Sequence, residues 1–181
     1  MKNIQYEFIP LKESDLPVIT DWLNRPHLQK WWREGKITQE MVRKKYLPRI
    51  MDEDSAKPYL AFLEDIPKGY IQYYSVSETE TNWWPDNPGP GVLGIDLFIA
   101  DPEQLNKGFG TLMVSQFVNF LFKKPGIREI RIDPRPDNLR AIRCYEKAGF
   151  KKAGPITNPD GPALMMTLDK NSFLEQNKNK I

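Results

Sequence analysis

The sequence predicts an α/β protein in which a mixed sheet carries helices on both faces. The first observation is a pair of apolar segments, residues 92–100 and 127–132, that have strand character and that each precede a segment of helical periodicity. The second is a pair of shorter apolar segments, residues 59–64 and 69–76, which a polar turn joins as in a hairpin. Hairpin strands together with strands that lead into helices favour a sheet of mixed direction.

The N-terminal part is predicted to hold one strand and one helix before two adjacent tryptophans. Residues 6–9 are apolar and typical of an edge strand. Ser14 is a good N-cap for a helix with an apolar face, and Pro26 would stop that helix. Trp31 and Trp32 are then expected in a connection.

A second helix is predicted ahead of the hairpin. Thr38 is placed to cap this helix, and Pro48 would mark its end. The hairpin follows, with residues 65–69 (Asp-Ile-Pro-Lys-Gly) as its turn.

The segment 78–91 is polar, contains proline and glycine, and is predicted to be a loop. Trp83 and Trp84 lie in it. Adjacent tryptophans in a polar loop either anchor the loop itself or contact a substrate as a lid would, and both readings stay open. The strand at 92–100 and a long helix that reaches Lys124 come next.

The C-terminal third is predicted to alternate strands and one helix. After the strand at 127–132, Asn138 caps a helix that Gly149 ends in a C′ position. Residues 150–153 and 163–168 have the pattern of two final strands.

Length and composition bound the class of protein. A chain of 181 residues suits one domain, here residues 1–170, followed by a polar C-terminal tail at 171–181 that is expected to fray. No apolar stretch reaches the length of a membrane span, and the N-terminus lacks the core of a signal peptide. Cys144 is the single cysteine, which excludes an internal disulfide and fits a reducing compartment, so the expected location is the cytoplasm. His27 is the single histidine, which argues against a histidine triad, and no metal is expected.

Charge is distributed unevenly along the chain, although the formal net charge is only +2. Residues 52–103 hold eleven acidic and two basic side chains, whereas residues 104–152 hold eleven basic and four acidic ones. Two solvated faces would explain this pattern. A polyanion bound on one side and a cation on the other would also explain it, as in an enzyme with a phosphorylated cofactor and a cationic substrate. Nucleic-acid binding is less favoured, because the cofactor phosphates would need the basic surplus.

The segment at which this charge changes sign is residues 104–111, Gln-Leu-Asn-Lys-Gly-Phe-Gly-Thr. It separates an apolar strand from a helix, and its two glycines are one residue apart. Such a turn lets backbone N–H groups approach a phosphate, and the positive end of the following helix points to the same place. A plain turn is the alternative. The segment is therefore a candidate pyrophosphate cradle.

A second segment makes a family resemblance specific. Residues 138–150 have the pattern Asn-x-x-Ala-x-x-x-Tyr-x-Lys-x-Gly-Phe, roughly thirty residues after the first glycine of the turn. The combination resembles the GNAT acetyltransferase superfamily, and the glycine turn then resembles that superfamily's acetyl-CoA pyrophosphate loop. Lys107, Gly108 and Gly110 match this loop, whereas Leu105 and Asn106 depart from it, so we expect contacts through the backbone.

The resemblance implies the GNAT acyltransferase fold: a central, mostly antiparallel sheet with a parallel splayed pair of strands and helices on both faces. Over nearly its full length the chain also resembles the aminoglycoside 6′-N-acetyltransferases of this superfamily. This implies acetyl-CoA (coenzyme A) as co-substrate, a cationic aminoglycoside amine as acceptor, antibiotic resistance, and a monomer or homodimer. The matching stretches are Asp21-Trp-Leu-Asn-Arg25, Trp31-Trp32, Tyr46-Leu-Pro48, Pro58-Tyr59, Gly69-Tyr70, Trp83-Trp84, Pro90-Gly91, Gly94-Ile-Asp96, Asp133-Pro134, Asn138 to Phe150 and Pro159-Asp-Gly-Pro-Ala163.

Two residues are candidates for catalysis. Acetyl transfer needs a neutral amine, although amines are mostly protonated at pH 7, and a carboxylate can bind the ammonium and then take its proton. Asp96 lies within an apolar strand and by resemblance is the general base; a carboxylate satisfied by an internal arginine or by the backbone is the alternative. By the same resemblance Tyr145 donates a hydrogen bond or a proton to the CoA thiolate, and a core tyrosine is the alternative.

The resemblance also implies two sets of binding residues. The co-substrate set provides mainly backbone groups: Phe98, Ile99, Asn106, Lys107, Gly108, Phe109, Gly110, Thr111, Asn138 and Ala141. The acceptor set joins acids to flat aromatic surfaces: Trp32, Tyr46, Asp54, Gln72, Trp83, Asp133 and Asp160, together with Asp96. Asp133 and Asp160 would alternatively form turns. Thr81 stands where these enzymes can carry an acid, so part of acceptor recognition is expected to differ.

Two other functions stay open. Siderophore-pathway acyltransferases of the same superfamily acylate a hydroxylated lysine or a diamine. They commonly carry a histidine where Asp96 stands, so the aspartate favours the amino-sugar reading. A non-catalytic CoA-binding module would bind acetyl-CoA without depending on Asp96.

Overall fold

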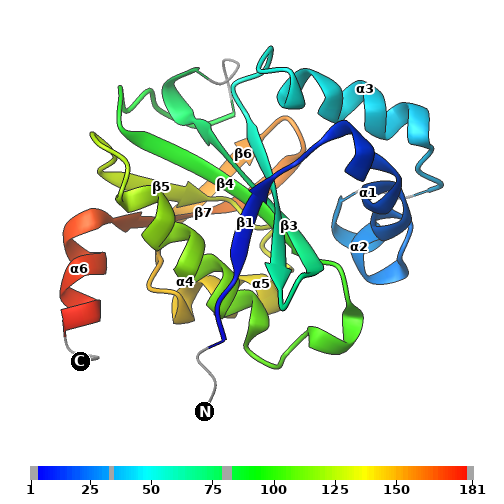
Figure 1. The fold of residues 1–181 in the computed structure, drawn as a ribbon. Helices are drawn as coiled ribbons and strands as arrows, with labels where there is room; N and C mark the ends of the chain where they lie inside the picture. Colours follow the sequence, from blue (N-terminus) through cyan, green and yellow to red (C-terminus); the bar gives the residue numbers. More distant parts are fainter. Residues whose placement is uncertain (1–3, 33–34, 79–82, 179–181) are drawn as a thin grey trace. The chain divides into compact units, whose positions relative to one another are not determined.

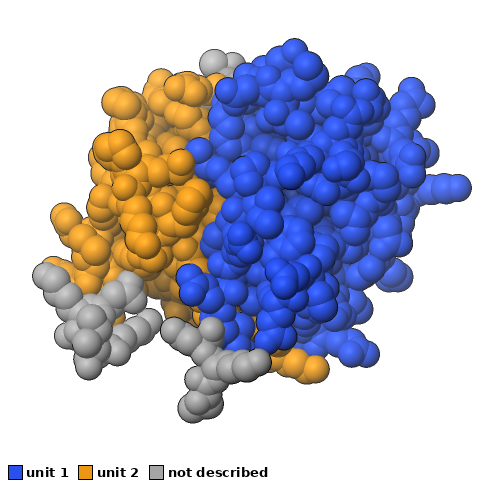
Figure 2. Space-filling model, in the orientation of Figure 1, with its two compact units in different colours: residues 1–73, 97–105 blue, residues 74–96, 106–181 orange. Residues whose placement is uncertain are grey.

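The computed structural model describes residues 4–32, 35–78 and 83–178, which fall into two compact units (Figure 2). Unit 1 consists of residues 1–73 and 97–105, and unit 2 of residues 74–96 and 106–181. Strands β3 (Ile66–Ser75) and β4 (Val92–Ile99) each run from one unit into the other. The prediction of a single domain over residues 1–170 stays a prediction.

Unit 1 contains antiparallel strands (Figure 1). β1 (Glu7–Pro10) pairs with β2 (Lys57–Leu63), and β2 pairs with β3, which confirms three predicted strands. The turn between β2 and β3 is shorter than predicted. Glu64 and Asp65 both adopt positive φ angles, 49° and 63°, and close the hairpin alone, so the rest of the predicted turn belongs to β3.

Two short helices follow β1. α1 (Leu16–Leu23) comes directly after a 3₁₀ turn, η1 (Glu13–Asp15), so the residue that precedes it is Asp15 and not the predicted Ser14. The prediction that Pro26 only stops α1 is also wrong, because α2 (Pro26–Trp32) begins there and ends with the paired tryptophans. Proline suits the first position of a helix, since its φ is already helical and its missing N–H would have no partner there.

The third helix of unit 1 begins as predicted. The Thr38 hydroxyl accepts a hydrogen bond from the Met41 N–H at 3.3 Å and so caps α3 (Gln39–Ile50). Pro48 lies inside its last turn rather than at its end. α1 packs against both α2 and α3, as Figure 1 shows. The buried core around these helices consists of Leu11, Leu16, Ile19, Trp22, Leu23, Leu28, Ile37, Val42, Tyr46, Leu60, Tyr70, Phe98 and Ala100.

Unit 2 contains the parallel pair of strands. β4 runs parallel to β5 (Glu129–Ile132), with Gly94 opposite Arg131. The next neighbour of β5 is β7 (Gly161–Asp169), which pairs in turn with β6 (Lys151–Asn158), both antiparallel. β6 and β7 are longer than predicted, because hairpin pairing carries them across glycine and proline residues that local preference disfavours.

Three helices belong to unit 2. α4 (Phe109–Phe122) and α5 (Leu139–Lys147) confirm the predicted pair. The predicted fraying of residues 171–181 is wrong for the described part, which forms α6 (Lys170–Lys178). The Phe173 ring lies 5.3 Å from that of Phe122, and this packing of a buried aromatic side chain holds the terminal helix on α4.

The strands and helices confirm the predicted α/β fold with a mixed sheet: one parallel pair stands among antiparallel ones. Two further 3₁₀ turns, η2 (Val76–Glu78) and η3 (Pro102–Gln104), follow β3 and β4. None of the helices within residues 4–32, 35–78 and 83–178 is long and apolar enough to cross a membrane.

Candidate active site

Two carboxyl groups are brought together in unit 2 by the register of the parallel strands. Asp96 and Asp133 each lie two residues beyond the Gly94–Arg131 pair, on β4 and just after β5. Residues at equivalent positions of adjacent parallel strands point to the same face of a sheet. The charge of Asp96 accordingly acts on both Asp133 and Tyr145. These three predicted site residues therefore form one acidic cluster.

Asp133 has hydrogen-bond donors from two other segments of unit 2. Asn158 Nδ2 and Trp83 Nε1 both donate to Asp133 Oδ2, at 2.7 Å and 3.1 Å. Burial first, and then the nearby charge of Asp96, raise the pKa of Asp133 to about 7, while these two donors act in the lowering direction. A carboxyl group with a pKa near 7 is well matched to proton transfer at neutral pH.

Tyr145 is buried on α5, with its ring 6.2 Å from that of Phe150. Burial raises its pKa well above the ordinary value, and the charges of Cys144, Asp96 and Asp133 raise it further. The hydroxyl consequently stays protonated at neutral pH. It is suited to donate a hydrogen bond to a developing anion.

The glycine turn has the backbone shape that a phosphate cradle needs. Asn106 and Gly108 both have positive φ angles, 61° and 88°, and Gly108 directly precedes α4. A Cβ on Gly108 would meet open space, so the backbone conformation, and not crowding, calls for glycine here. Lys107 is exposed, and within the described residues no side chain caps the first turn of α4. Its N–H groups are thus available to an anion.

The remaining co-substrate residues of unit 2 connect α4 to α5. The Thr111 hydroxyl lies 3.5 Å from the Cys144 carbonyl oxygen and 3.6 Å from its Sγ. Asn138 Oδ1 accepts a hydrogen bond from the Ala141 N–H at 3.3 Å, so this side chain is engaged as the cap of α5. Thr111 therefore contacts α5, whereas Asn138 is held by a local cap at the start of α5.

Phe98 and Ile99 lie where β4 enters unit 1. The Phe98 side chain is buried in the unit 1 core, so only its backbone could serve the predicted role. Two side chains near the start of α2 hold carbonyl oxygens at this strand end. His27 Nε2 lies 3.1 Å from the Ile99 oxygen, and Arg25 Nη1 donates to the Ala100 oxygen at 2.8 Å.

An aromatic cluster in unit 1 contains two of the predicted acceptor residues. The Trp32 ring meets Phe98 edge-on at 5.1 Å and Tyr70 at 6.4 Å. Tyr46 meets Tyr70 edge-on at 5.4 Å, and Tyr70 stacks on Phe98 at 5.3 Å. Trp32 and Tyr46 are thus joined through two rings, Tyr70 and Phe98, whose side chains were not predicted to contact the acceptor.

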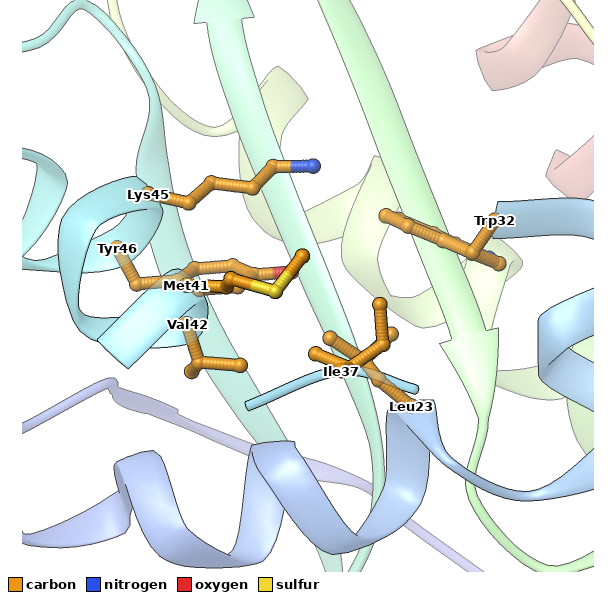
Figure 3. Close-up of a pocket in the computed structure, with 7 residues that line it drawn as sticks. All are labelled: Leu23, Trp32, Ile37, Met41, Val42, Lys45 and Tyr46. Atoms are coloured by element: carbon orange, nitrogen blue, oxygen red, sulfur yellow. The ribbon is translucent and has the colours of Figure 1, made fainter. Parts of the chain in front are cut away.

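A pocket of about 70 Å³ lies between the helices of unit 1 (Figure 3). Its wall is mostly apolar, and the charged side chain in it is that of Lys45, which extends toward Trp32 in the close-up. Lys45 Nζ lies 5.7 Å from the Trp32 ring centroid and 5.8 Å from that of Tyr46. The residues that line the pocket are Leu23, Trp32, Ile37, Met41, Val42, Lys45 and Tyr46.

Asp54 and Gln72, the polar acceptor residues predicted in unit 1, share a partner that the prediction missed. Arg49 donates to both of them. Tyr70 also donates to Gln72 Oε1, at 2.5 Å. No local signal marked Arg49, because its partner Gln72 is 23 positions away in the sequence.

The described part of the tryptophan loop is fastened to β5. Arg131, only 6% exposed, forms ion pairs with Asp86 and Glu129, both at 2.6 Å, and its guanidinium lies 5.8 Å from the Trp84 ring. Trp84 is buried, whereas Trp83 is half-buried and reaches Asp133. In this loop one tryptophan is an anchor and its neighbour contributes to the acidic cluster.

Asp160, the last predicted acceptor residue, is exposed in the turn between β6 and β7, where its N–H bonds to Asn158 Oδ1 at 2.9 Å. Asn158 itself was missed, since a lone asparagine before a proline has the signature of a turn. Thr81 lies outside the described residues. Among the described residues, no group of three or more His, Cys, Asp or Glu side chains is placed to hold a metal ion.

Comparison with known proteins agrees with this geometry. A family model described as an acetyltransferase (GNAT) domain matches residues 12–158. The chain is 44% identical to aminoglycoside N(6′)-acetyltransferase type 1 of Klebsiella pneumoniae over 165 residues, which cover 90% of this chain and 82% of that protein. It is also 50% identical over 91 residues to a kanamycin resistance protein of Rhizobium radiobacter, covering 50% of this chain and 84% of the relative.

A solved structure extends the similarity to the fold. The aminoglycoside acetyltransferase AAC(6′)-Ib in complex with coenzyme A and kanamycin matches with a TM-score of 0.89 at 42% identity, over 94% of this chain and 98% of that one. The family model and the extended sequence identity lead to one conclusion: this chain belongs to the GNAT acetyltransferase family.

Proposed function

We propose that the chain is an acetyl-CoA-dependent N-acetyltransferase that acetylates the 6′-amino group of aminoglycosides and so confers resistance to them. The observation that carries the proposal is the cluster of Asp96, Asp133 and Tyr145, which joins a pair of carboxyl groups to a protonated hydroxyl. The named relatives act on, or bind, aminoglycosides, and this supports the choice of acceptor.

The carboxyl pair would bind and activate the amine. One ammonium placed between Asp96 and Asp133 relieves their mutual repulsion and lets both ionise. Asp96 then takes a proton from the ammonium, which leaves a neutral amine able to attack the thioester carbonyl. Asp133, held by Asn158 and Trp83, keeps the ammonium in place during this transfer.

Tyr145 would act on the leaving group. Its raised pKa makes complete loss of the phenolic proton to a thiolate unfavourable, so the hydroxyl serves chiefly as a hydrogen-bond donor that stabilises the thiolate as it forms. Backbone N–H groups at Phe98 and Ile99 would polarise the thioester carbonyl, as we expect from the family.

The residues of the glycine turn fit the pyrophosphate of CoA. Asn106 to Thr111 would contribute backbone N–H groups, and the positive end of α4 would face the phosphates. Lys107 would add a charge from the exposed side of the turn. Because acetyl-CoA is supplied in the cytoplasm, we retain that location as part of the proposal, and a monomer or homodimer stays a prediction.

The test is release of free CoA from acetyl-CoA with a panel of amines: kanamycin-type sugars, polyamines, peptides and hydroxylysine. Turnover on the sugars, abolished in an Asp96→Ala variant that circular dichroism shows to be folded, is the expected result. Turnover only on hydroxylysine would move the enzyme to lysine acylation, the activity named for a Mycobacterium tuberculosis relative that is 28% identical. Full activity of Asp96→Ala would remove the proposed base.

A further inference from the structure

Unit 1 places a basic side chain among the groups that the proposed function assigns to a cationic acceptor. Arg49, in the last turn of α3, donates from Nε to Asp54 Oδ2 at 3.1 Å and from Nη1 to Gln72 Oε1 at 2.7 Å. Its Cζ lies 5.6 Å from the ring centroid of Tyr46. A single guanidinium therefore contacts three predicted acceptor residues at once.

This guanidinium is a permanent part of the cluster. The Arg49 side chain is 17% exposed and that of Asp54 is 35% exposed, so water screens the pair less than it would on an open surface. Burial alone would lower the pKa of Arg49, but the neighbouring Tyr70, Asp54 and Tyr46 raise it above its ordinary value. Arg49 is consequently charged at every pH at which the enzyme works.

An ammonium group is recognised by a carboxylate, by acceptor oxygens and by the face of an aromatic ring. Asp54, Gln72 and Tyr46 offer these three features, and Arg49 makes the matching contact with each one. Lys45 adds a second cation near the Tyr46 ring. An incoming ammonium would meet a carboxylate that is already neutralised.

We propose that Arg49 is a specificity-determining residue that takes the place of a substrate ammonium at Asp54, so that this subsite accepts an uncharged, hydroxyl-bearing part of the sugar. The inference rests on the proposed function, which supplies the acceptor. It predicts that the chain binds amine-rich aminoglycosides less tightly than its count of acidic residues suggests. Arg49 thus shifts the recognition of charge to the Asp96–Asp133 pair.

The experiment measures KM for kanamycin A by CoA release at saturating acetyl-CoA. In Arg49→Gln the carboxylate of Asp54 loses its cationic partner and keeps the Ala56 N–H on Oδ1, so KM is expected to fall roughly three- to tenfold at low ionic strength, and the gain is expected to disappear in 0.5 M salt. Arg43→Gln is the matched control, because Arg43 is exposed on the same helix and pairs with Glu13 instead. Its KM is expected to stay within about twofold of the wild type.

A double variant keeps the test decisive if Arg49→Gln folds poorly. Arg49→Gln combined with Asp54→Asn replaces the ion pair by two neutral amides, which removes the unpaired charge that endangers folding. The subsite is then as neutral as in the wild type, so KM is expected to match the wild type within about twofold. A fivefold rise in KM would show that Asp54 binds the acceptor directly and would overturn the proposal.

The failure of the two proposals can be told apart. If the wild-type enzyme shows no turnover on any aminoglycoside, the proposed function is overturned before a variant is examined. If the wild type turns over aminoglycosides but a correctly folded Arg49→Gln variant has an unchanged KM, only the proposed role of Arg49 is overturned. In that case Arg49 only fastens α3 to β3. Correct folding is judged by circular dichroism and Tm.

Discussion

Replacing Asp133 with asparagine removes a carboxyl group whose pKa burial and the charge of Asp96 raise to about 7. In an unfolded chain the pKa of an aspartate is roughly 4. Between these values the folded protein binds a proton at Asp133 that the unfolded chain does not bind. The stabilising effect of this proton is therefore complete below about pH 4 and is lost as the pH rises through 7.

The size of the change in the free energy of unfolding follows from the pKa shift of Asp133. One pKa unit corresponds to about 1.4 kcal/mol, so the change from 3.8 to about 7 corresponds to roughly 4 kcal/mol in full. Between pH 5 and pH 8 this one group would lower the free energy of unfolding by roughly 2–3 kcal/mol. An asparagine oxygen can still accept the hydrogen bonds of Trp83 and Asn158, because both donate to a single oxygen of Asp133.

Urea unfolding at pH 5 and pH 8, followed by tryptophan fluorescence, measures this difference. We expect Asp133→Asn to lose roughly 2–3 kcal/mol of the pH dependence seen in the wild type and to be the more stable protein at pH 8. Asp137→Asn removes an equal charge from an exposed position of the same unit and serves as the control. If Asp133→Asn kept the pH dependence of the wild type, the raised pKa and the coupling to Asp96 would both be refuted.

Three further substitutions test other parts of the structure. Tyr145→Phe removes the proposed donor to the thiolate and is expected to reduce kcat roughly 10- to 100-fold with KM for acetyl-CoA little changed, which steady-state kinetics would show. Arg131→Met leaves the carboxylates of Asp86 and Glu129 uncompensated and should lower the free energy of unfolding by about 2–3 kcal/mol in urea titrations, whereas a change below 0.5 kcal/mol would mean that the loop is not held by this network. Phe173→Ala should cost about 3 kcal/mol by the same assay, because the ring is buried against α4, while the exposed Leu174 of the same helix can be truncated with little effect.

The helix starts that could be predicted are those with a local cause. Thr38 and Asn138 each accept a hydrogen bond from an N–H three residues ahead, so the sequence around each position carries the signal. α6 has no such signal, because its apolar anchor, Phe173, packs on a helix more than forty residues earlier. A polar tail and a docked polar helix have the same composition, and only the distant contact separates them.

The same difference between local and distant contacts separates the site residues that could be predicted from those that could not. Asp96 and Asp133 could be predicted because each lies just beyond or within an apolar strand, and the parallel register then brings them together. Arg49 and Asn158 could not, because an arginine in a helix and an asparagine before a turn are ordinary residues there. Their partners, Gln72 and Asp133, are 23 and 25 positions away. Hydrogen bonds between distant side chains leave no periodic trace in the sequence.

The uneven distribution of charge has to be reinterpreted in the light of these pairs. Counted along the sequence, residues 52–103 offer a surplus of negative charge to a cationic substrate. In the folded chain Asp54 is paired with Arg49 and Asp86 with Arg131, two arginines from outside the segment, so two of these acidic charges are neutralised within the protein. Ionisation of Asp133, by contrast, is held back by burial and by the charge of Asp96, and an arriving ammonium would favour it. We therefore expect the attraction for a cationic acceptor to depend on Asp96 and Asp133 more than on the net charge of the region.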